Sequence, residues 1–112
     1  SQLRSDLVDY DMNMHAIGLT HFRTFEEKIA GVRSAAPMVM KYVGTEAEVT
    51  KSELLLAIMG SQGLGWEGDG FSKSEIDTLR LWAMSKIMTI AGGTSEIQLN
   101  VIAKNVLQLP QS

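Results

Sequence analysis

Apolar residues recur every three or four positions through most of this chain, and no stretch of any length shows the alternation typical of a strand. The first of these stripes predicts a helix from about Ser5 to Lys28 and assigns Phe22 and Phe25 to the core. Its members are Leu3, Leu7, Tyr10, Met14, Ile17, His21 and Phe25. The spacing therefore favours an all-α fold.

A second, long helix is expected from near Ser34 to Ile58. Pro37 is tolerated only in the first turn of a helix, and it falls there. We expect one helix rather than two, because the apolar stripe keeps its phase across Gly44. The glycine-rich segment Gly60–Gly65 then predicts a loop.

Two shorter helices complete the pattern. Ser72 and Glu75 have the spacing of a capping box, which predicts a third helix that reaches the glycine pair at 92 and 93. The fourth is expected from about Ser95 to Leu107, before Pro110. Residues 1–112 are thus predicted to form one domain, an up-and-down helical bundle.

Composition excludes several classes of function. A net charge of −3 argues against nucleic acid or an anionic membrane as partner, and no apolar run approaches the roughly 20 residues that span a bilayer. Cysteine is absent, which fits a reducing, cytoplasmic setting. His15 and His21 lie on different faces of one helix without acidic neighbours at ligand spacing, so no metal site is expected.

The stretch Ile90–Ile97 carries the strongest local signal. Gly92 and Gly93 end the preceding helix, and Thr94 offers a capping oxygen to the next one. Backbone N–H groups at such a helix start favour anionic or electron-rich groups. An ordinary capped helix start and the edge of a cofactor site are both compatible with this pattern.

The order of these pieces resembles the C-terminal helical domain of flavin-dependent acyl-CoA dehydrogenases. The resemblance rests on Gly60-Ser61-Gln62-Gly63, on Gly92-Gly93-Thr94-Ser95-Glu96-Ile97-Gln98, on Ile102-Ala103-Lys104 and on the ending Leu107-Gln108-Leu109-Pro110. It covers essentially all 112 residues but only the last part of a family chain, without the first helix of the C-terminal domain.

By that resemblance the whole enzyme is an oxidoreductase that removes hydrogens from the α- and β-carbons of an acyl-CoA thioester in lipid catabolism. A glutamate takes the α-proton and the β-hydrogen leaves as hydride to FAD. Electron-transfer flavoprotein or a similar acceptor, and a homo-oligomeric (tetramer) or heteromeric partner subunit, are implied. This segment alone is expected to be inactive.

The resemblance also assigns site residues. Thr94 and Glu96 are expected to contact FAD, and Gly60, Ser61, Gln62 and Gly63 to reach the ADP half of an FAD held by a neighbouring subunit. Ile90, Ala91, Gly92 and Gly93 are expected to lie against the substrate.

Three positions depart from the family pattern. Many members have their catalytic glutamate where this chain has Gly92, so the catalytic residue is unknown. Some branches of the family supply the base from an earlier helix, which this chain lacks, and others include subunits with no base. Ala57 replaces a usual glutamine and Leu99 a frequent arginine. The alternatives are therefore a non-catalytic partner subunit of a heteromeric dehydrogenase, or a helical oligomerisation module.

Overall fold

The computed structural model describes residues 1–110, and within them it contains helices and no strand. The all-α prediction is therefore confirmed. The elements are α1 (Gln2–Ile29), α2 (Ala36–Met59), the 3-10 helix η1 (Gly60–Leu64), α3 (Lys73–Met88) and α4 (Ser95–Asn105).

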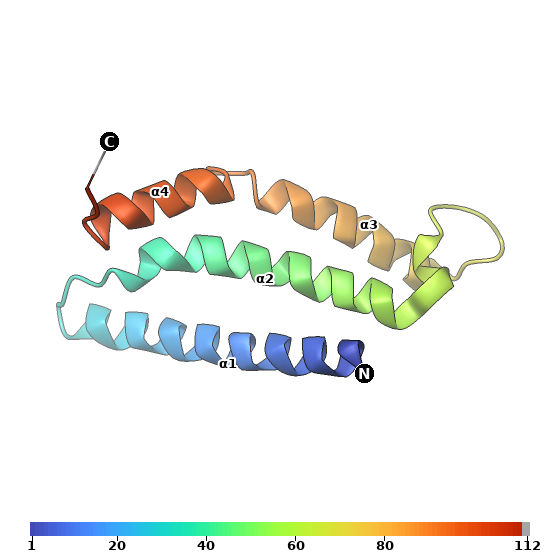
Figure 1. Cartoon of the computed structure of the whole chain (residues 1–112), viewed down its shortest axis with the longest axis horizontal. Coiled ribbons are helices and arrows are strands. Elements are labelled where there is room, and N and C mark those ends of the chain that lie inside the picture. The colour runs from blue at the N-terminus through green and yellow to red at the C-terminus, as the bar shows by residue number, and fades with distance from the viewer. Residues whose placement is uncertain (111–112) are drawn as a thin grey trace.

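Helix α2 lies in the middle of the molecule. The antiparallel α1 packs along one side of it, and α3 and α4 follow one another end to end along the other side (Figure 1). Within the described residues, α1 contacts no helix other than α2. The up-and-down helical bundle is confirmed, as an open arrangement in which α2 is the shared partner.

Local sequence signals explain where the helices begin. The hydroxyl of Ser72 accepts the backbone N–H of Glu75, and the Glu75 carboxylate accepts the backbone N–H of Ser72 at 2.7 Å, so the predicted capping box is formed. Pro37 lies in the first turn of α2, where no intrahelical donor is needed. Helix α2 also continues unbroken through Gly44, as predicted.

Two expectations about the ends of the long helices were wrong. The segment from Gly60 is not an open loop, because residues 60–64 form η1 and fold back onto α2, with Gly63 buried against Leu56. Phe22 and Phe25 are about three-fifths exposed rather than in the core. The side of α1 that faces α2 instead presents half-buried residues at seven-residue intervals: Leu3, Tyr10, Ile17 and Thr24.

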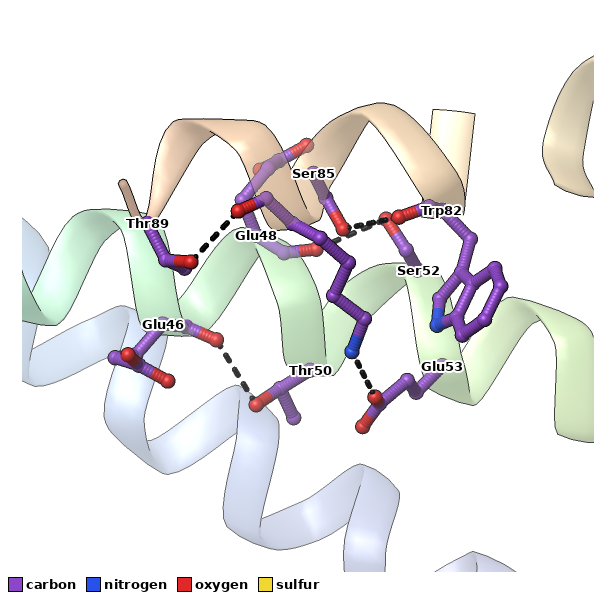
Figure 2. Close-up of polar contacts among 9 residues, drawn as sticks. Glu46, Glu48, Thr50, Ser52, Glu53, Trp82, Ser85 and Thr89 are labelled. Atoms are coloured by element: carbon purple, nitrogen blue, oxygen red, sulfur yellow. Dashed lines mark hydrogen bonds and ion pairs between the residues drawn. The ribbon is translucent and has the colours of Figure 1, made fainter. Parts of the chain in front are cut away.

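Small polar residues lie at the centre of the contact between α2 and α3. Ser52 and Ser85 are buried, and their hydroxyls donate to carbonyls of their own helices, Glu48 at 2.9 Å and Trp82 at 2.6 Å (Figure 2). Their polar groups are therefore satisfied without a partner across the interface. Small side chains at this position let the two helices approach closely.

The length and composition of the helices also show whether any of them could cross a membrane. Over residues 1–110, none of them combines the length and the apolar character that crossing a bilayer would require.

Candidate functional site

The candidate site is the turn between α3 and α4. Helix α3 ends as Ile90 and Ala91 donate their backbone N–H groups to the carbonyl of Ile87 at 3.0 and 2.9 Å. Gly92 and Gly93 then adopt φ values of +72° and +118°, which L-residues with a side chain rarely adopt. This pair of conformations directs the chain into α4 over the surface of α2, and leaves Ile90, Ala91 and Gly92 exposed.

Thr94 begins α4 as its N-cap residue. Its hydroxyl oxygen accepts the backbone N–H of Ile97 at 3.2 Å, so the predicted cap is confirmed. The cap uses only a lone pair of that oxygen, and the hydroxyl hydrogen of Thr94 remains able to donate. The capping role and a ligand-binding role are therefore compatible in the same side chain.

The carbonyl groups of the turn already have donors from the protein. Lys41 Nζ donates to the carbonyl of Gly93 at 2.7 Å, and Gln98 Nε2 donates to that of Gly92 at 3.2 Å. The backbone N–H of Gln98 donates to the carbonyl of Thr94 at 2.9 Å. Three successive acceptors of the backbone are satisfied from within the chain.

Backbone N–H groups of the same turn, unlike its carbonyl groups, are left without partners from the described residues. The N–H groups of Thr94, Ser95 and Glu96 have no acceptor among residues 1–110. They lie at the positive end of the α4 dipole, where an electron-rich or anionic group is stabilised. The turn is therefore a surface of donors, which suits a ligand whose edge carries acceptors, such as the ring carbonyls of a flavin or a phosphate.

Side-chain charges around the turn come from two helices. The hydroxyl of Ser95 donates to Glu46 Oε1 of α2, and Glu96 presents an exposed carboxylate in the first turn of α4. Lys41 and Glu46 are both half-buried, and neither takes part in the ion pairs formed within residues 1–110. Each of these two charges is directed at the turn rather than at the other.

The two groups of predicted cofactor residues are not brought together in one chain. The turn lies against the N-terminal half of α2, whereas Gly60, Ser61, Gln62 and Gly63 follow its C-terminal end. The helical rise from Glu46 to Gly60 alone amounts to about 21 Å. Ser61 and Gln62 are exposed there, and Gly63 is buried.

Lys41, Glu46 and Gln98 were not identified as site residues from the sequence. Lys41 and Glu46 are the only charged residues between Ala36 and Ala47, in a stretch that is otherwise apolar or small. Lone charges inside such a stretch signal specific partners, because an unpaired charge at a half-buried position is costly. That signal predicts that Lys41 and Glu46 have partners, but it does not identify those partners, which lie about 50 residues later in the sequence.

Fold and turn together define a class of protein: an all-helical domain that presents a donor-rich helix start from a double-glycine turn. The model of the family "Acyl-CoA dehydrogenase, C-terminal domain" matches residues 2–107, and the chain belongs to that family. No curated protein and no solved structure gives a match to this chain.

Proposed function

We propose that this chain is the C-terminal helical part of an FAD-dependent acyl-CoA dehydrogenase, and that its turn at residues 92–96 contacts the flavin. The observation that carries the proposal is the donor surface at the start of α4, with its backbone acceptors already occupied. A flavin presents ring carbonyls and phosphates, which need donors of this kind. FAD, when bound, supplies the hydride acceptor for the oxidation of an acyl-CoA thioester.

The contribution of this chain is binding and orientation. The free N–H groups of Thr94, Ser95 and Glu96 and the hydroxyl of Thr94 hold acceptors of the cofactor in a fixed place. Beside Ile90, the residues Ala91, Gly92 and Gly93 have little or no side chain. A substrate is therefore able to approach the backbone there. The segment Gly60–Gly63 serves the ADP half of an FAD on a neighbouring subunit.

The proton-abstracting base comes from outside the turn. Gly92 occupies the position where many relatives have glutamate, and glycine has no group that accepts a proton. The base is supplied by a segment other than residues 1–112 or by a partner subunit. The 112-residue chain alone is accordingly expected neither to bind FAD tightly nor to turn over substrate. We place the enzyme in the cytoplasm, with electron-transfer flavoprotein or a similar acceptor as its redox partner.

The hydroxyl of Thr94 gives the most direct test. In the protein at its native length, Thr94→Val should weaken FAD binding about tenfold, because it removes a donor to the cofactor. The same change removes a cap and lowers stability by about 1 kcal/mol. Titration of the apoprotein followed by flavin absorbance measures the affinity, and chemical denaturation measures the stability.

Ser72→Ala is the matched control for this test. It removes the equivalent capping hydroxyl of α3 and should lower stability by a similar amount, about 1 kcal/mol. FAD affinity should stay at the wild-type value, because Ser72 lies at the other end of α3 from the turn. An equal loss of affinity in both variants, or no FAD binding by the wild type, would refute the contact.

The second candidate function is a partner subunit that lacks a base in a heteromeric dehydrogenase, and Gly92 is the observation that favours it. Anaerobic addition of acyl-CoA distinguishes the two. Bleaching of the flavin band by the purified protein alone indicates a complete active site. Bleaching only after a co-purifying subunit is restored indicates the partner role.

A further inference from the structure

The Gly92-Gly93-Thr94 turn contains a peptide whose orientation must be fixed if the turn is to act as a rigid surface of donors. The peptide between Gly93 and Thr94 rotates through ψ of Gly93 and φ of Thr94, and on the glycine side the absence of a Cβ leaves this rotation little hindered. Gly93 already has a φ of +118°. Thr94, a β-branched residue, has a φ of −62° and must keep φ negative, so this rotation is limited to a tilt over a φ range of roughly −60° to −160°, which redirects the carbonyl and the N–H group without exchanging them.

Lys41 is placed to prevent that rotation. Lys41 is half-buried on α2, and its ammonium group donates to the carbonyl oxygen of Gly93, 52 residues later in the sequence, at an Nζ–O distance of 2.7 Å. The carbonyl of Gly93 and the N–H of Thr94 belong to the same trans peptide plane, in which they point in opposite directions. Holding the carbonyl toward α2 therefore directs the N–H of Thr94 away from α2.

We propose that Lys41 is a positioning residue that fixes the orientation of the Gly93–Thr94 peptide and so keeps the Thr94 N–H available to the cofactor. This inference rests on the proposed flavin contact and adds the residue on which its geometry depends. Glu46 supports the same arrangement one step along the chain, where it accepts the hydroxyl of Ser95. Both side chains come from α2, so the turn is held against a helix to which it is not adjacent in sequence.

An ammonium group suits this task better than a neutral donor. Hydrogen bonds from a charged donor are roughly twice as strong as neutral ones, which disfavours the rotated state of the peptide. Lys41 has no carboxylate partner in the ion pairs of residues 1–110, so its charge stays on the Gly93 carbonyl. The same positive charge adds to the field that favours an electron-rich ligand at the start of α4.

The test compares three variants of the native-length protein. Lys41→Met keeps the length and removes the donor, whereas Lys41→Arg keeps a charged donor. Lys51→Met is the control, because Lys51 belongs to the same helix but pairs with Glu48 on the exposed surface at 3.1 Å. FAD affinity should fall about tenfold or more in Lys41→Met, and should stay near the wild-type value in Lys41→Arg and Lys51→Met.

A second readout does not depend on the cofactor. In the apoprotein, nitrogen-15 relaxation dispersion at Gly93 and Thr94 should show microsecond-to-millisecond exchange in Lys41→Met, and none in wild type or Lys51→Met. Chemical denaturation of all variants separates this local effect from a general loss of stability.

The outcomes separate the two proposals. FAD binding that survives intact in Lys41→Met overturns the role of Lys41 and leaves the proposed function standing. An equal loss of affinity in Lys41→Met and Lys41→Arg also overturns it, since arginine retains the donor. Failure of the wild type to bind FAD overturns the proposed function itself.

Discussion

Gly92 and Gly93 differ in how strictly their positions require glycine. The φ of Gly92, +72°, lies in the left-handed region, which other residues adopt at a cost of about 1–2 kcal/mol. The φ of Gly93, +118°, lies beyond that region, and a Cβ there would also meet Gln98 Nε2 at 2.7 Å. Gln98 is the donor to the Gly92 carbonyl, so a side chain at 93 would disturb the turn itself.

We therefore expect Gly93→Ala to lower the free energy of unfolding by about 1–3 kcal/mol, more than Gly92→Ala does. Gly44→Ala is the control, because Gly44 is inside α2 and a Cβ there meets nothing within 4 Å. That change should stabilise the protein by about 0.5–1 kcal/mol. Urea denaturation of the three variants tests the order, and equal effects of Gly93→Ala and Gly44→Ala would contradict it.

At the scale of the elements, an ion pair joins α2 to α3. Lys86 of α3 donates to Glu53 Oε1 of α2 at 2.7 Å, and its ammonium group lies 5.1 Å from the ring centre of Trp82. The hydrogen bond from Lys86 lowers the pKa of Glu53, and this effect outweighs the partial burial that would raise it. Because both side chains are about half exposed, the pair contributes at most about 1 kcal/mol.

The sign of the pH dependence follows from that pKa. A carboxyl group with a folded-state pKa below its unfolded value stabilises the fold above the unfolded pKa, and this contribution is lost as the pH falls through the folded pKa. Lys86→Met should therefore lower stability at neutral pH by about 0.2–1 kcal/mol and have less effect at acidic pH below both values. Unfolding free energies measured across that range test this expectation.

Lys73→Met provides a comparison, because Lys73 pairs with Asp77 inside α3 and is almost fully exposed. It should leave the titration of Glu53 unchanged. A shift of the Glu53 pKa in Lys73→Met, or no shift in Lys86→Met, would mean that a residue other than Lys86 lowers the pKa of Glu53.

How far the sequence predicts each element depends on how local its determinants are. The capping box of Ser72 and Glu75 and the cap by Thr94 were predicted, because both act within one helical turn. The contacts of Lys41 and Glu46 with the turn were not, because they join segments about 50 residues apart. The phenylalanines of α1 were assigned to the wrong side because that helix has apolar residues on opposite faces, and periodicity does not say which face has a partner.

At the level of the whole molecule, the chain buries little apolar surface. Leu54, which is 8% exposed, is the one hydrophobic residue that is buried within residues 1–110. The accessible surface is 8128 Å², against about 6,100 Å² for a compact monomer of the same mass. The radius of gyration is 17.5 Å, against about 13 Å for a compact domain of this length.

Part of the uncovered apolar surface lies on the side of α1 that faces away from α2. It forms a stripe of exposed residues at helical spacing: Val8, Met12, Leu19, Phe22 and Ile29. We expect the 112-residue chain by itself to associate as its concentration rises, because apolar patches of this extent are rarely left in contact with water. Sedimentation velocity over a wide range of concentrations measures this association.

Replacing the two largest central members, Leu19→Gln with Phe22→Gln, should shift the association to higher concentration. The matched control is Leu81→Gln with Met84→Gln, two residues similarly exposed on α3. A chain that stays monomeric throughout, or a control pair with the same effect, would rule out the stripe as the surface responsible.

The arrangement of the helices has a mechanical consequence. Because α1 contacts only α2 among the helices of residues 1–110, and α3 and α4 rest on the opposite side of α2, the two flanks have no direct connection. A displacement of the turn at residues 92–95 can reach α1 only by moving or bending the middle helix. Removing either flank would leave the contacts of the other intact, whereas a break in the middle helix would disconnect all of them at once.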